Sequence, residues 1–175
     1  IAVDSAGNVY VTDRSNNRIE KFTSDGTFIT KWGSAGSEDV QFISPYGIAI
    51  DSTDHVYLAD EGNHRIQKFT NNGVFIKKWG SLGDTDGNFH APKGIAVDSQ
   101  NNILVSDNNN QRVQKFTNNG VFITKWDTTT PGDTTSSRPT GLAVDSNDNV
   151  YIADETNFVF KKFSSSGTLL SRTGS

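Results

Sequence analysis

The tetrapeptide Ile1-Ala2-Val3-Asp4 decides the fold, because close copies of it return along the chain every 47 residues. The copies are Ile48-Ala49-Ile50-Asp51, Ile95-Ala96-Val97-Asp98 and Leu142-Ala143-Val144-Asp145. The same interval relates an aspartate, a phenylalanine and a glycine in every copy: Asp13, Asp60, Asp107 and Asp154; Phe22, Phe69, Phe116 and Phe163; Gly26, Gly73, Gly120 and Gly167. A period of this length over the whole chain predicts a repeat architecture, in which each repeat is one structural unit.

Each repeat is expected to form four short strands. In the first repeat, β-branched and aromatic residues between turn residues place these strands at 1–4, 9–12, 18–23 and 27–32. Asn72-Gly73 and Asn119-Gly120 fall between the third and fourth strands, and Asn-Gly supplies the positive φ angles of a tight hairpin. No segment has a 3.6-residue hydrophobic period, so no helix is expected.

Four antiparallel strands in a repeat of this length are typical of a β-propeller blade. The first two strands of each repeat are apolar on both sides, and a sheet this small cannot cover both of its own faces. Neighbouring blades stacked around an axis would cover them. We therefore predict one all-β propeller domain over residues 1–175, with four blades at about 1–33, 47–80, 94–127 and 141–174.

Composition excludes several classes of site. The 175 residues include no cysteine, which rules out disulfides, cysteine-ligated zinc and thiol catalysis. No apolar run reaches the ~18 residues of a membrane helix, and no signal peptide is visible. The polar composition is compatible with an exported protein, but the compartment stays open.

Three segments of the third repeat resemble the NHL repeat. They are Pro92-Lys93-Gly94-Ile95-Ala96-Val97-Asp98, Asn102-Ile103-Leu104-Val105-Ser106-Asp107 and Asn110-Gln111-Arg112-Val113-Gln114-Lys115-Phe116. The resemblance covers essentially the whole chain and implies a six-bladed ring in the intact molecule. We therefore expect this chain to be part of a longer propeller whose remaining blades cover the apolar faces of the first and fourth blades. A closed four-bladed ring is the alternative.

The fourth repeat departs from this pattern. Val159 stands where the other repeats have Arg18, Arg65 and Arg112, and the loop before it lacks the phenylalanine found as Phe42 and Phe89. We expect the loop at 127–140 to differ from its counterparts. The repeated aspartates and arginines are interpreted as structural, because every blade has them, and the retention of Asp154 without the arginine indicates a role that does not depend on it.

In a propeller, the loops joining successive blades and the loops joining second and third strands gather on one face, here called the loop face. The loops between blades (33–46, 80–93 and 127–140) are long and variable, and variable loops on a repeated scaffold usually carry binding specificity. The second set lies at 13–17, 60–64, 107–111 and 154–158. The binding candidates on both sets are Phe42, Tyr46, Glu61, His64, Asp84, Asp86, Phe89, His90 and Arg138. For Phe42 and Phe89 the simpler interpretation is that they anchor their loops.

Charge argues against a nucleic-acid partner. The three long loops hold six acids and two bases: Glu38, Asp39, Asp84, Asp86, Asp127 and Asp133 against Lys93 and Arg138. A phosphate backbone requires clustered lysine and arginine. A protein, peptide or glycan is therefore the expected partner, in addition to the remaining blades of the parent chain.

Asp84, Asp86 and Asn88 resemble the start of a calcium loop, with oxygen-bearing side chains at positions 1, 3 and 5. The glycine comes too early, and Ile95 stands where a calcium loop has glutamate. A polar turn is the simpler interpretation, with calcium as the alternative. The three histidines occupy different repeat positions, and nothing in the sequence brings His64 and His90 together.

No nucleophile elbow or phosphate-binding loop is present, and the innermost strands are near-identical copies with no asymmetric set of catalytic residues. We expect a non-enzymatic scaffold that needs no cofactor and binds its partner through the loop face. A propeller lyase or hydrolase with its catalytic residues in other blades is the first alternative. An RNA-binding or ubiquitin-ligase-associated NHL module is the second.

Overall fold

The computed structural model describes residues 1–174 and contains four antiparallel sheets of four strands each, which confirms the all-β fold. Blade one consists of β1 (Ala2–Val3), β2 (Val9–Asp13), β3 (Arg18–Phe22) and β4 (Phe28–Trp32). Blade two consists of β7 (Pro45–Ile50), β8 (Val56–Asp60), β9 (Arg65–Phe69) and β10 (Phe75–Trp79). Blade three consists of β11 (Pro92–Val97), β12 (Ile103–Asp107), β13 (Arg112–Phe116) and β14 (Phe122–Asp127). Blade four consists of β15 (Pro139–Val144), β16 (Val150–Asp154), β17 (Val159–Phe163) and β18 (Leu169–Gly174).

Two details differ from the sequence prediction. The innermost strands β7, β11 and β15 begin at a proline, three residues earlier than expected, with a register shift after that proline. The loops after β2 and β8 each contain a single 3-10 turn, η1 (Arg14–Asn16) and η2 (Glu61–Asn63), where no helix was expected. A short parallel pair, β5 (Ser34–Ala35) with β6 (Gln41–Phe42), closes the loop between blades one and two. Among the described residues no helix is long and apolar enough to cross a membrane.

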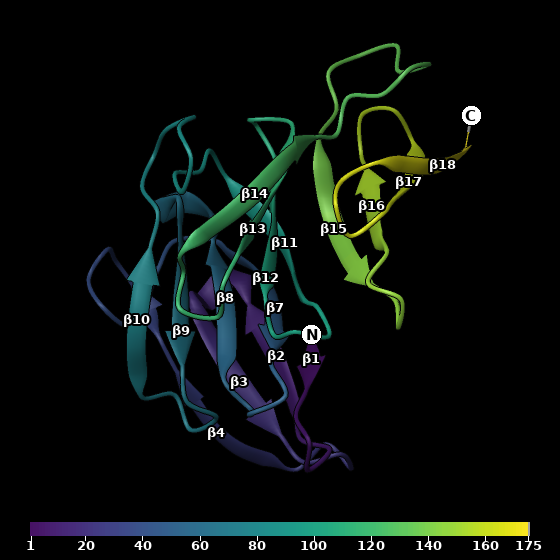
Figure 1. The fold of residues 1–175 in the computed structure, drawn as a ribbon. Helices are drawn as coiled ribbons and strands as arrows, with labels where there is room; N and C mark the ends of the chain where they lie inside the picture. The colour runs from purple at the N-terminus through teal and green to yellow at the C-terminus, as the bar shows by residue number, and fades with distance from the viewer. Residues whose placement is uncertain (175) are drawn as a thin grey trace.

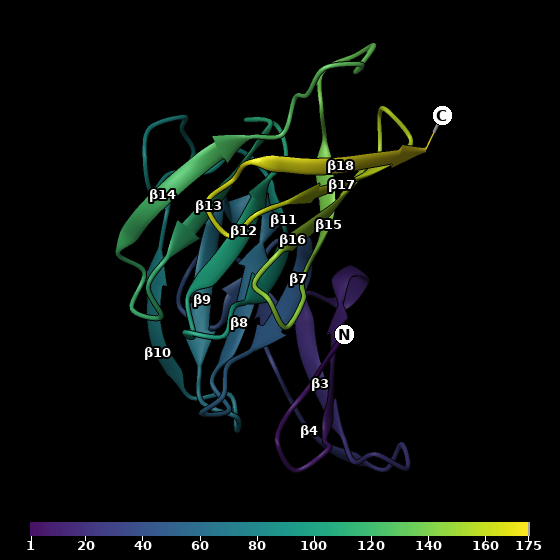
Figure 2. The same cartoon turned by 45° about the vertical axis from the view of Figure 1, so that its right-hand side comes forward.

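The four sheets fan around a common axis (Figures 1 and 2), with β7, β11 and β15 side by side at the centre. Two glycines permit this close approach. A Cβ atom on Gly47 would lie 2.3 Å from the Lys93 carbonyl oxygen, and one on Gly94 would lie 2.4 Å from that of Thr140. Only a residue without a side chain fits where two backbones come this close. The repeated Pro-x-Gly motif therefore sets the spacing of blades at the axis.

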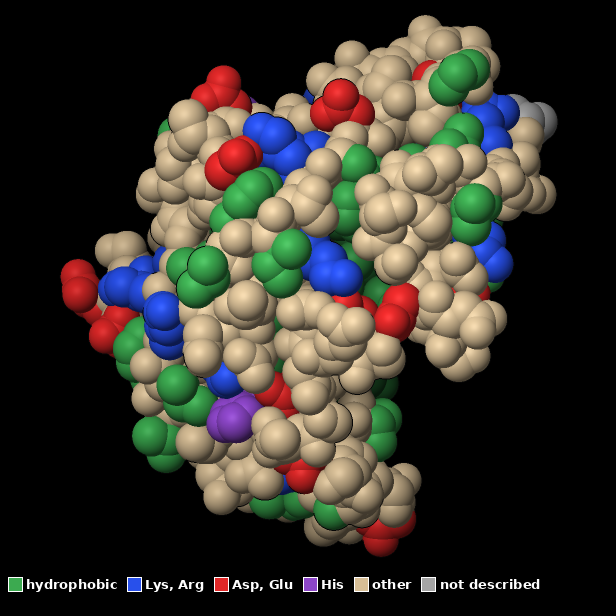
Figure 3. Space-filling view, in the orientation of Figure 1, with side chains coloured by type: hydrophobic (Ala, Val, Ile, Leu, Met, Phe, Trp, Pro, Cys, Tyr) green, Lys and Arg blue, Asp and Glu red, His purple; other side chains and the backbone are tan. Residues whose placement is uncertain are grey.

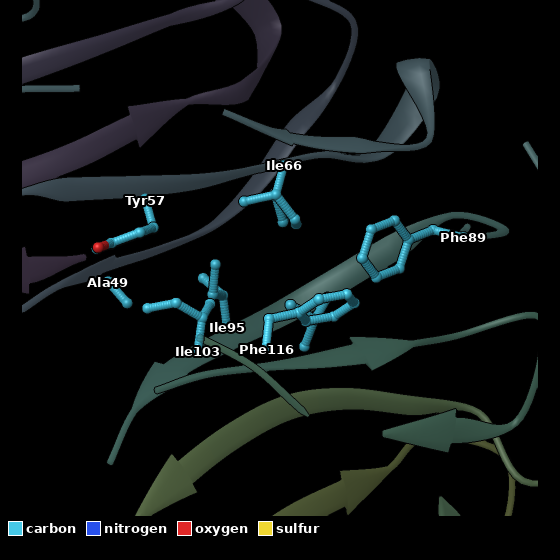
Figure 4. Packing of buried hydrophobic residues seen from close by; sticks show 9 residues of the cluster. Ala49, Tyr57, Ile66, Phe89, Ile95, Ile103 and Phe116 are labelled. Atoms are coloured by element: carbon cyan, nitrogen blue, oxygen red, sulfur yellow. The ribbon is translucent and has the colours of Figure 1, made fainter. Parts of the chain in front are cut away.

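The hydrophobic core lies between blades rather than within them. In the interface of blades two and three, Tyr57 and Ile66 on one sheet pack against Ile103 and Phe116 on the next, and all four are fully buried (Figure 4). Equivalent clusters fill the interfaces of blades one and two and of blades three and four. Each blade is thus stable only against its neighbours, as expected of a small sheet with two apolar faces.

An aspartate at the end of each innermost strand organises the turn that follows. The Asp4 carboxylate accepts the backbone N–H groups of Ala6 (3.1 Å) and Asn8 (2.8 Å) and the hydroxyl of Tyr10 (2.9 Å). Burial opposes its ionisation, but the hydrogen bonds from Asn8 and Tyr10 prevail and lower the pKa of Asp4 to about 2. This repeated aspartate therefore forms the turn between the first and second strands of the blade. These turns lie on the face opposite the loop face.

Candidate binding site on the loop face

The long loops belong to the loop face, and those at 80–93 and 127–140 rise above the blades at the top of Figure 1. Two of these loops are held from below by one buried residue pair each. Arg65 binds Asp60 (2.8 Å) and donates to the carbonyl oxygens of Ser37 (2.6 Å) and Gln41 (2.8 Å). Arg112 repeats the arrangement with Asp107 (2.7 Å) in blade three. The repeated aspartate and arginine are therefore structural, as predicted.

Blade four holds its loop by different chemistry. Lys161 is fully buried and binds Asp154 (2.8 Å), Asp133 (2.6 Å) and the carbonyl oxygen of Thr128 (2.7 Å). Lys161 stands at the repeat position of Gln114, and it anchors the loop in place of both Gln114 and the missing arginine. The hydrogen bond from Lys161 outweighs burial and lowers the pKa of Asp133. The loop at 127–140 is thus as firmly anchored as the others but follows a different path.

Phe42 and Phe89 are fully buried, each against a neighbouring glycine and phenylalanine. A Cβ atom on Gly33 would lie 2.3 Å from the Phe42 ring, and one on Gly80 would lie 2.5 Å from the Phe89 ring. Their burial removes them from the surface that a partner can reach. They anchor their loops, which was the simpler of the two interpretations.

His64 and His90 meet edge to face with ring centroids 5.7 Å apart, although nothing in the sequence suggested their contact. The His64 Nδ1 atom accepts the Ala91 backbone N–H (3.1 Å), just as the Asn17 side chain accepts that of Ser44 (2.9 Å) one repeat earlier. Burial lowers the pKa of His64, and the adjacent His90 ring lowers it further. His64 is therefore a neutral hydrogen-bond acceptor with a structural role.

Tyr46, at the second position of β7, lies half-exposed at the axis end of the loop face. The Arg14 guanidinium and the Lys93 ammonium lie 5.4 Å and 5.7 Å from its ring centroid. Arg14 also pairs with Glu61 (2.7 Å), and Lys93 pairs with Glu155 (3.2 Å). Both cations on this side of the face are thus already matched by a carboxylate, which leaves Tyr46 as an aromatic surface within a balanced charge network.

A cleft of about 350 Å³ opens on the loop face between blades three and four. Three loops supply its lining, and every lining side chain is polar: His90, Asn108, Asn109, Gln111, Ser136, Ser137 and Arg138. Ser136 and Ser137 stand at the repeat positions of Phe89 and His90, so small hydroxyl groups face the cleft where the previous interface has aromatic rings. Arg138 makes no ion pair with any described residue, unlike the other loop-face cations Arg14 and Lys93.

The acidic loop residues are less available than composition suggests. Asp39 pairs with Lys78 (2.8 Å), Asp86 pairs with Lys125 (2.6 Å), and Asp133 pairs with the buried Lys161. On the face of the molecule that Figure 3 shows, acidic and basic side chains are interspersed, without one continuous basic patch. The cleft, which has Arg138 and no acid in its lining, is locally more positive than the loop face as a whole.

Two of the three proposed calcium ligands, the side chains of Asp86 and Asn88, are engaged elsewhere in this structure. The Asp84 backbone carbonyl accepts Arg112 (2.7 Å), Asp86 pairs with Lys125, and the Asn88 side-chain oxygen accepts the Ser81 hydroxyl (2.8 Å). Within residues 1–174, no three histidine, aspartate or glutamate side chains gather as metal ligands. Calcium binding stays a prediction, which requires Asp86 to leave Lys125.

Sequence reasoning missed Arg14, Lys93, Asn109, Gln111 and Ser136. A signal was present: the residue after the repeated aspartate is of three different types in the four copies (Arg14, Glu61, Asn108 and Glu155), and the residue after the repeated proline differs in all three (Tyr46, Lys93 and Thr140). Positions that vary between copies while their neighbours stay constant mark the loop-face surface.

Comparison with known sequences fits this geometry. The sequence profile of the NHL repeat matches residues 1–22, 42–69, 89–116 and 137–163, which is more than half of the chain. This chain belongs to the NHL-repeat family. The matches begin at the innermost strand of each blade, or at the loop residues just before it, and end with the third strand. No curated protein sequence gives a significant match to this NHL chain.

Solved structures share the fold at low sequence identity. Virginiamycin B lyase from Staphylococcus aureus is 20% identical with a TM-score of 0.75, and the match covers 98% of this chain and 53% of that one. A streptogramin B lyase is 18% identical with a TM-score of 0.77, covering 100% and 53%. Hydrazine synthase from Kuenenia stuttgartiensis is 10% identical with a TM-score of 0.73, covering 98% and 47%. This NHL chain therefore spans about half the length of the structures it resembles.

Proposed function

We propose that this NHL propeller is a non-enzymatic scaffold that binds a protein, peptide or glycan through its loop face, with the cleft between blades three and four at the centre of the site. One observation carries the proposal. The cleft is lined by residues that differ between repeats, whereas the residues beneath it, Asp107, Arg112 and Lys161, serve only to hold its loops. Rigid loops that present variable side chains are typical of binding surfaces.

The chemistry of the cleft suits a polar ligand. The amides of Asn109 and Gln111 and the hydroxyl of Ser136 both donate and accept hydrogen bonds, as peptide groups and sugar hydroxyls require. Arg138 adds one positive charge with no carboxylate partner, and a guanidinium binds a carboxylate through two parallel hydrogen bonds. Tyr46, at the axis end of the same face, offers a half-exposed ring for an apolar or sugar-ring contact.

Peptide and glycan arrays, incubated with the labelled chain, test this proposal. We expect a small group of related ligands to bind, and Arg138→Ala and Gln111→Ala each to weaken that binding about tenfold or more, as loss of a charged or buried hydrogen bond does. Lys31→Ala, on an outer strand away from the cleft, is the matched control and should bind normally. Binding that survives both cleft substitutions would place the site elsewhere and contradict the proposal.

The lyase alternative is kept because the virginiamycin B and streptogramin B lyases share this fold. One of the similar structures is a catalytically inactive variant of virginiamycin B lyase with quinupristin. This alternative predicts that quinupristin binds the loop face of the present chain, detectably by calorimetry, and that His90→Ala weakens the binding. The scaffold proposal predicts no heat with quinupristin at concentrations that saturate the array-selected ligand.

The RNA alternative is not favoured by the charges. A phosphate backbone is held by several free lysines and arginines, and binding then falls steeply with salt. Arg138 is the one loop-face cation described here without a carboxylate partner, since Arg14 and Lys93 are paired. Salt-sensitive binding of single-stranded RNA on the same arrays would support this alternative over the scaffold.

A further inference from the structure

The cleft between blades three and four is more positively charged than the same place between blades two and three. Two of its lining residues, Asn108 and Arg138, account for the difference. Asn108 stands at the repeat position of Glu61, so a neutral amide replaces a carboxylate. Arg138 stands at the repeat position of Ala91, so a guanidinium replaces a methyl group. One negative charge is thus lost and one positive charge is gained at this interface.

The backbone that carries Arg138 is held by three hydrogen bonds. Its N–H donates to the Asp154 carboxylate (3.1 Å), and its carbonyl oxygen accepts the Glu155 N–H (3.2 Å). The carbonyl oxygen of the next residue, Pro139, accepts the side-chain amide of Asn108 (3.0 Å), which is fully enclosed. Arg138 itself is exposed, and its guanidinium pairs with no carboxylate of residues 1–174. A cation on a fixed backbone loses less conformational freedom when it binds an anion.

The carboxylates closest to Arg138 in the chain are already matched by other cations. Asp154 binds the buried Lys161 (2.8 Å), and Glu155 binds Lys93 (3.2 Å). The lining of the cleft itself includes no aspartate or glutamate. An anion that enters the cleft therefore meets an available guanidinium, and no lining carboxylate repels it.

The amide of Gln111 is oriented by the neighbouring loop. Its side-chain oxygen accepts the Thr129 hydroxyl (3.2 Å), and its backbone carbonyl oxygen accepts the Thr128 N–H (2.8 Å). Because the side-chain oxygen is engaged, the NH₂ group of Gln111 is the part available to a ligand. Asn109 and Ser136 are exposed in the same lining, and their side chains both donate and accept hydrogen bonds. The cleft thus offers one cation together with several neutral polar groups.

The absence of aliphatic side chains from this lining distinguishes between two sources of a carboxylate. A peptide is recognised partly through pockets for its side chains, and the lining offers no apolar pocket, since His90 supplies its one ring. A sugar acid instead carries its carboxylate on a ring whose other substituents are hydroxyls, and both match the lining. A volume of about 350 Å³ is at the small end of ligand sites, which suits about one or two sugar rings.

We propose that the cleft binds an acidic sugar, a hexuronate unit of a glycan, whose carboxylate pairs with the Arg138 guanidinium while its ring hydroxyls bond to Gln111 and Ser136. The inference rests on the proposed function, because it takes the cleft as the binding site, and it narrows the partner to a negatively charged glycan. The planar guanidinium matches a carboxylate through two parallel hydrogen bonds, which fixes the orientation of the sugar as well as its affinity.

Calorimetry with trimers of galacturonate, glucuronate and mannuronate tests the proposal, each trimer being compared with its methyl ester. The ester keeps the sugar rings and removes the charge. We expect at least one acidic trimer to bind with a dissociation constant below about 1 mM, and its ester to bind about tenfold more weakly or worse. Raising the salt concentration from about 0.05 M to about 0.5 M should weaken binding of the acid and leave that of the ester unchanged.

Substitutions at two exposed lining residues locate the charge effect in the cleft. Arg138→Ala should weaken binding of the acidic trimer about tenfold or more, and Arg138→Lys should recover only part of it, because an ammonium lacks the planar pair of donors. Ser136→Asp adds a carboxylate to the lining and should also weaken binding, whereas the uncharged Ser136→Asn should retain most of it. Lys31→Ala, which removes the same charge from an outer strand, is the control and should bind normally. Circular dichroism checks that each variant retains its strands.

The outcomes separate this inference from the proposed function. Equal binding of an acidic trimer and its ester would assign the cleft to neutral glycans and overturn the acidic sugar, while the scaffold proposal would stand. No binding by any of the three acidic trimers at about 1 mM would overturn it as well. A peptide that then binds with a free but not an amidated C-terminus, and requires Arg138, would assign the cleft to peptide ends instead. If no trimer and no array ligand binds, the proposed function fails together with the inference.

Discussion

The interface between blades two and three and the interface between blades three and four use one scaffold, but they differ at the loop face, where the second opens a cleft. In the first, Phe89 lies buried against Phe116 and closes the interface beneath the loop. In the second, Ser136 occupies the same repeat position and lines the cleft. The difference teaches that repeated residues make the blades, while a few exchanged residues at one interface make a surface available for binding.

The two interfaces also anchor their loops differently, and this gives the largest expected effect. Lys161→Ala leaves the buried carboxylates of Asp154 and Asp133 without their cation, which should lower the free energy of unfolding by about 5 kcal/mol. Chemical denaturation monitored by tryptophan fluorescence measures the loss. Lys162→Ala, at the half-buried neighbour that lies 3.6 Å from Asp145, is the control and should cost little. A small effect at Lys161 would mean that Asp133 and Asp154 are not the anchor of the 127–140 loop.

Phe89 and Ser136 test the closed and open interfaces directly. Phe89→Ala removes a fully buried ring and should lower the free energy of unfolding by about 4 kcal/mol. Ser136→Ala, at the matching position of the open interface, should change it by no more than about 0.5 kcal/mol. Equal effects at the two positions, again measured by denaturation, would remove the distinction between a closing aromatic residue and a cleft-lining one.

A smaller difference in stability is expected between alanine substitutions at two turn glycines, Gly120, which a tryptophan ring covers, and Gly26, which no side chain covers. Alanine costs about 1–2 kcal/mol at a positive φ angle, and both Gly120 (74°) and Gly26 (87°) have one. A Cβ atom on Gly120 would also lie 2.7 Å from the Trp79 side chain, which should add about 1–3 kcal/mol of overlap. Thermal melting should therefore rank Gly120→Ala clearly below Gly26→Ala, and identical melting temperatures would show that Trp79 yields without cost.

The smallest effect concerns His64, which lies in the closed interface only. Its pKa is lowered in the folded chain, so the unfolded chain binds a proton first as the pH falls below about 6.5. The free energy of unfolding should fall from that pH down to the folded pKa of His64, and below it His64 adds no further slope. The total loss should be at most about 0.5 kcal/mol, because solvent screens the ring. His64→Asn, which copies Asn17, should remove this slope, and a slope that persists would assign it to another group.

The turn aspartates give a second, separate dependence of stability on pH, at acid pH. The pKa of Asp4 is lowered to about 2 by hydrogen bonds that outweigh burial, and those of Asp51 and Asp98 are lowered in the same way. Their stabilisation is present above the unfolded aspartate pKa of about 3.9 and is lost as the pH falls towards about 2. This window lies well below that of His64, so pH titration of stability separates the two.

The sequence predicted the blades well because their residues recur. Ile48 and Ile95 lie at the same place in the innermost strand, and the Asn-Gly turns join the same two strands in each copy. Four copies in register therefore predicted a single architecture. The cleft was not predictable in this way. It depends on Lys161 taking the place of Gln114, on the path of the 127–140 loop, and on residues from three separate loops meeting in space. The contact of His64 with His90 arises likewise from two loops whose relative position the repeat alone does not fix.

The measurement that tests the central claim most directly is an NMR titration of the isotope-labelled chain with the ligand selected by the arrays. The claim is that unrepeated loop-face residues bind and repeated residues only support them. It predicts that backbone shifts concentrate at 108–111 and 136–138, while the turns at 51–55 and 98–102 on the opposite face stay unchanged. Shifts concentrated at those opposite turns, with an undisturbed cleft, would contradict it.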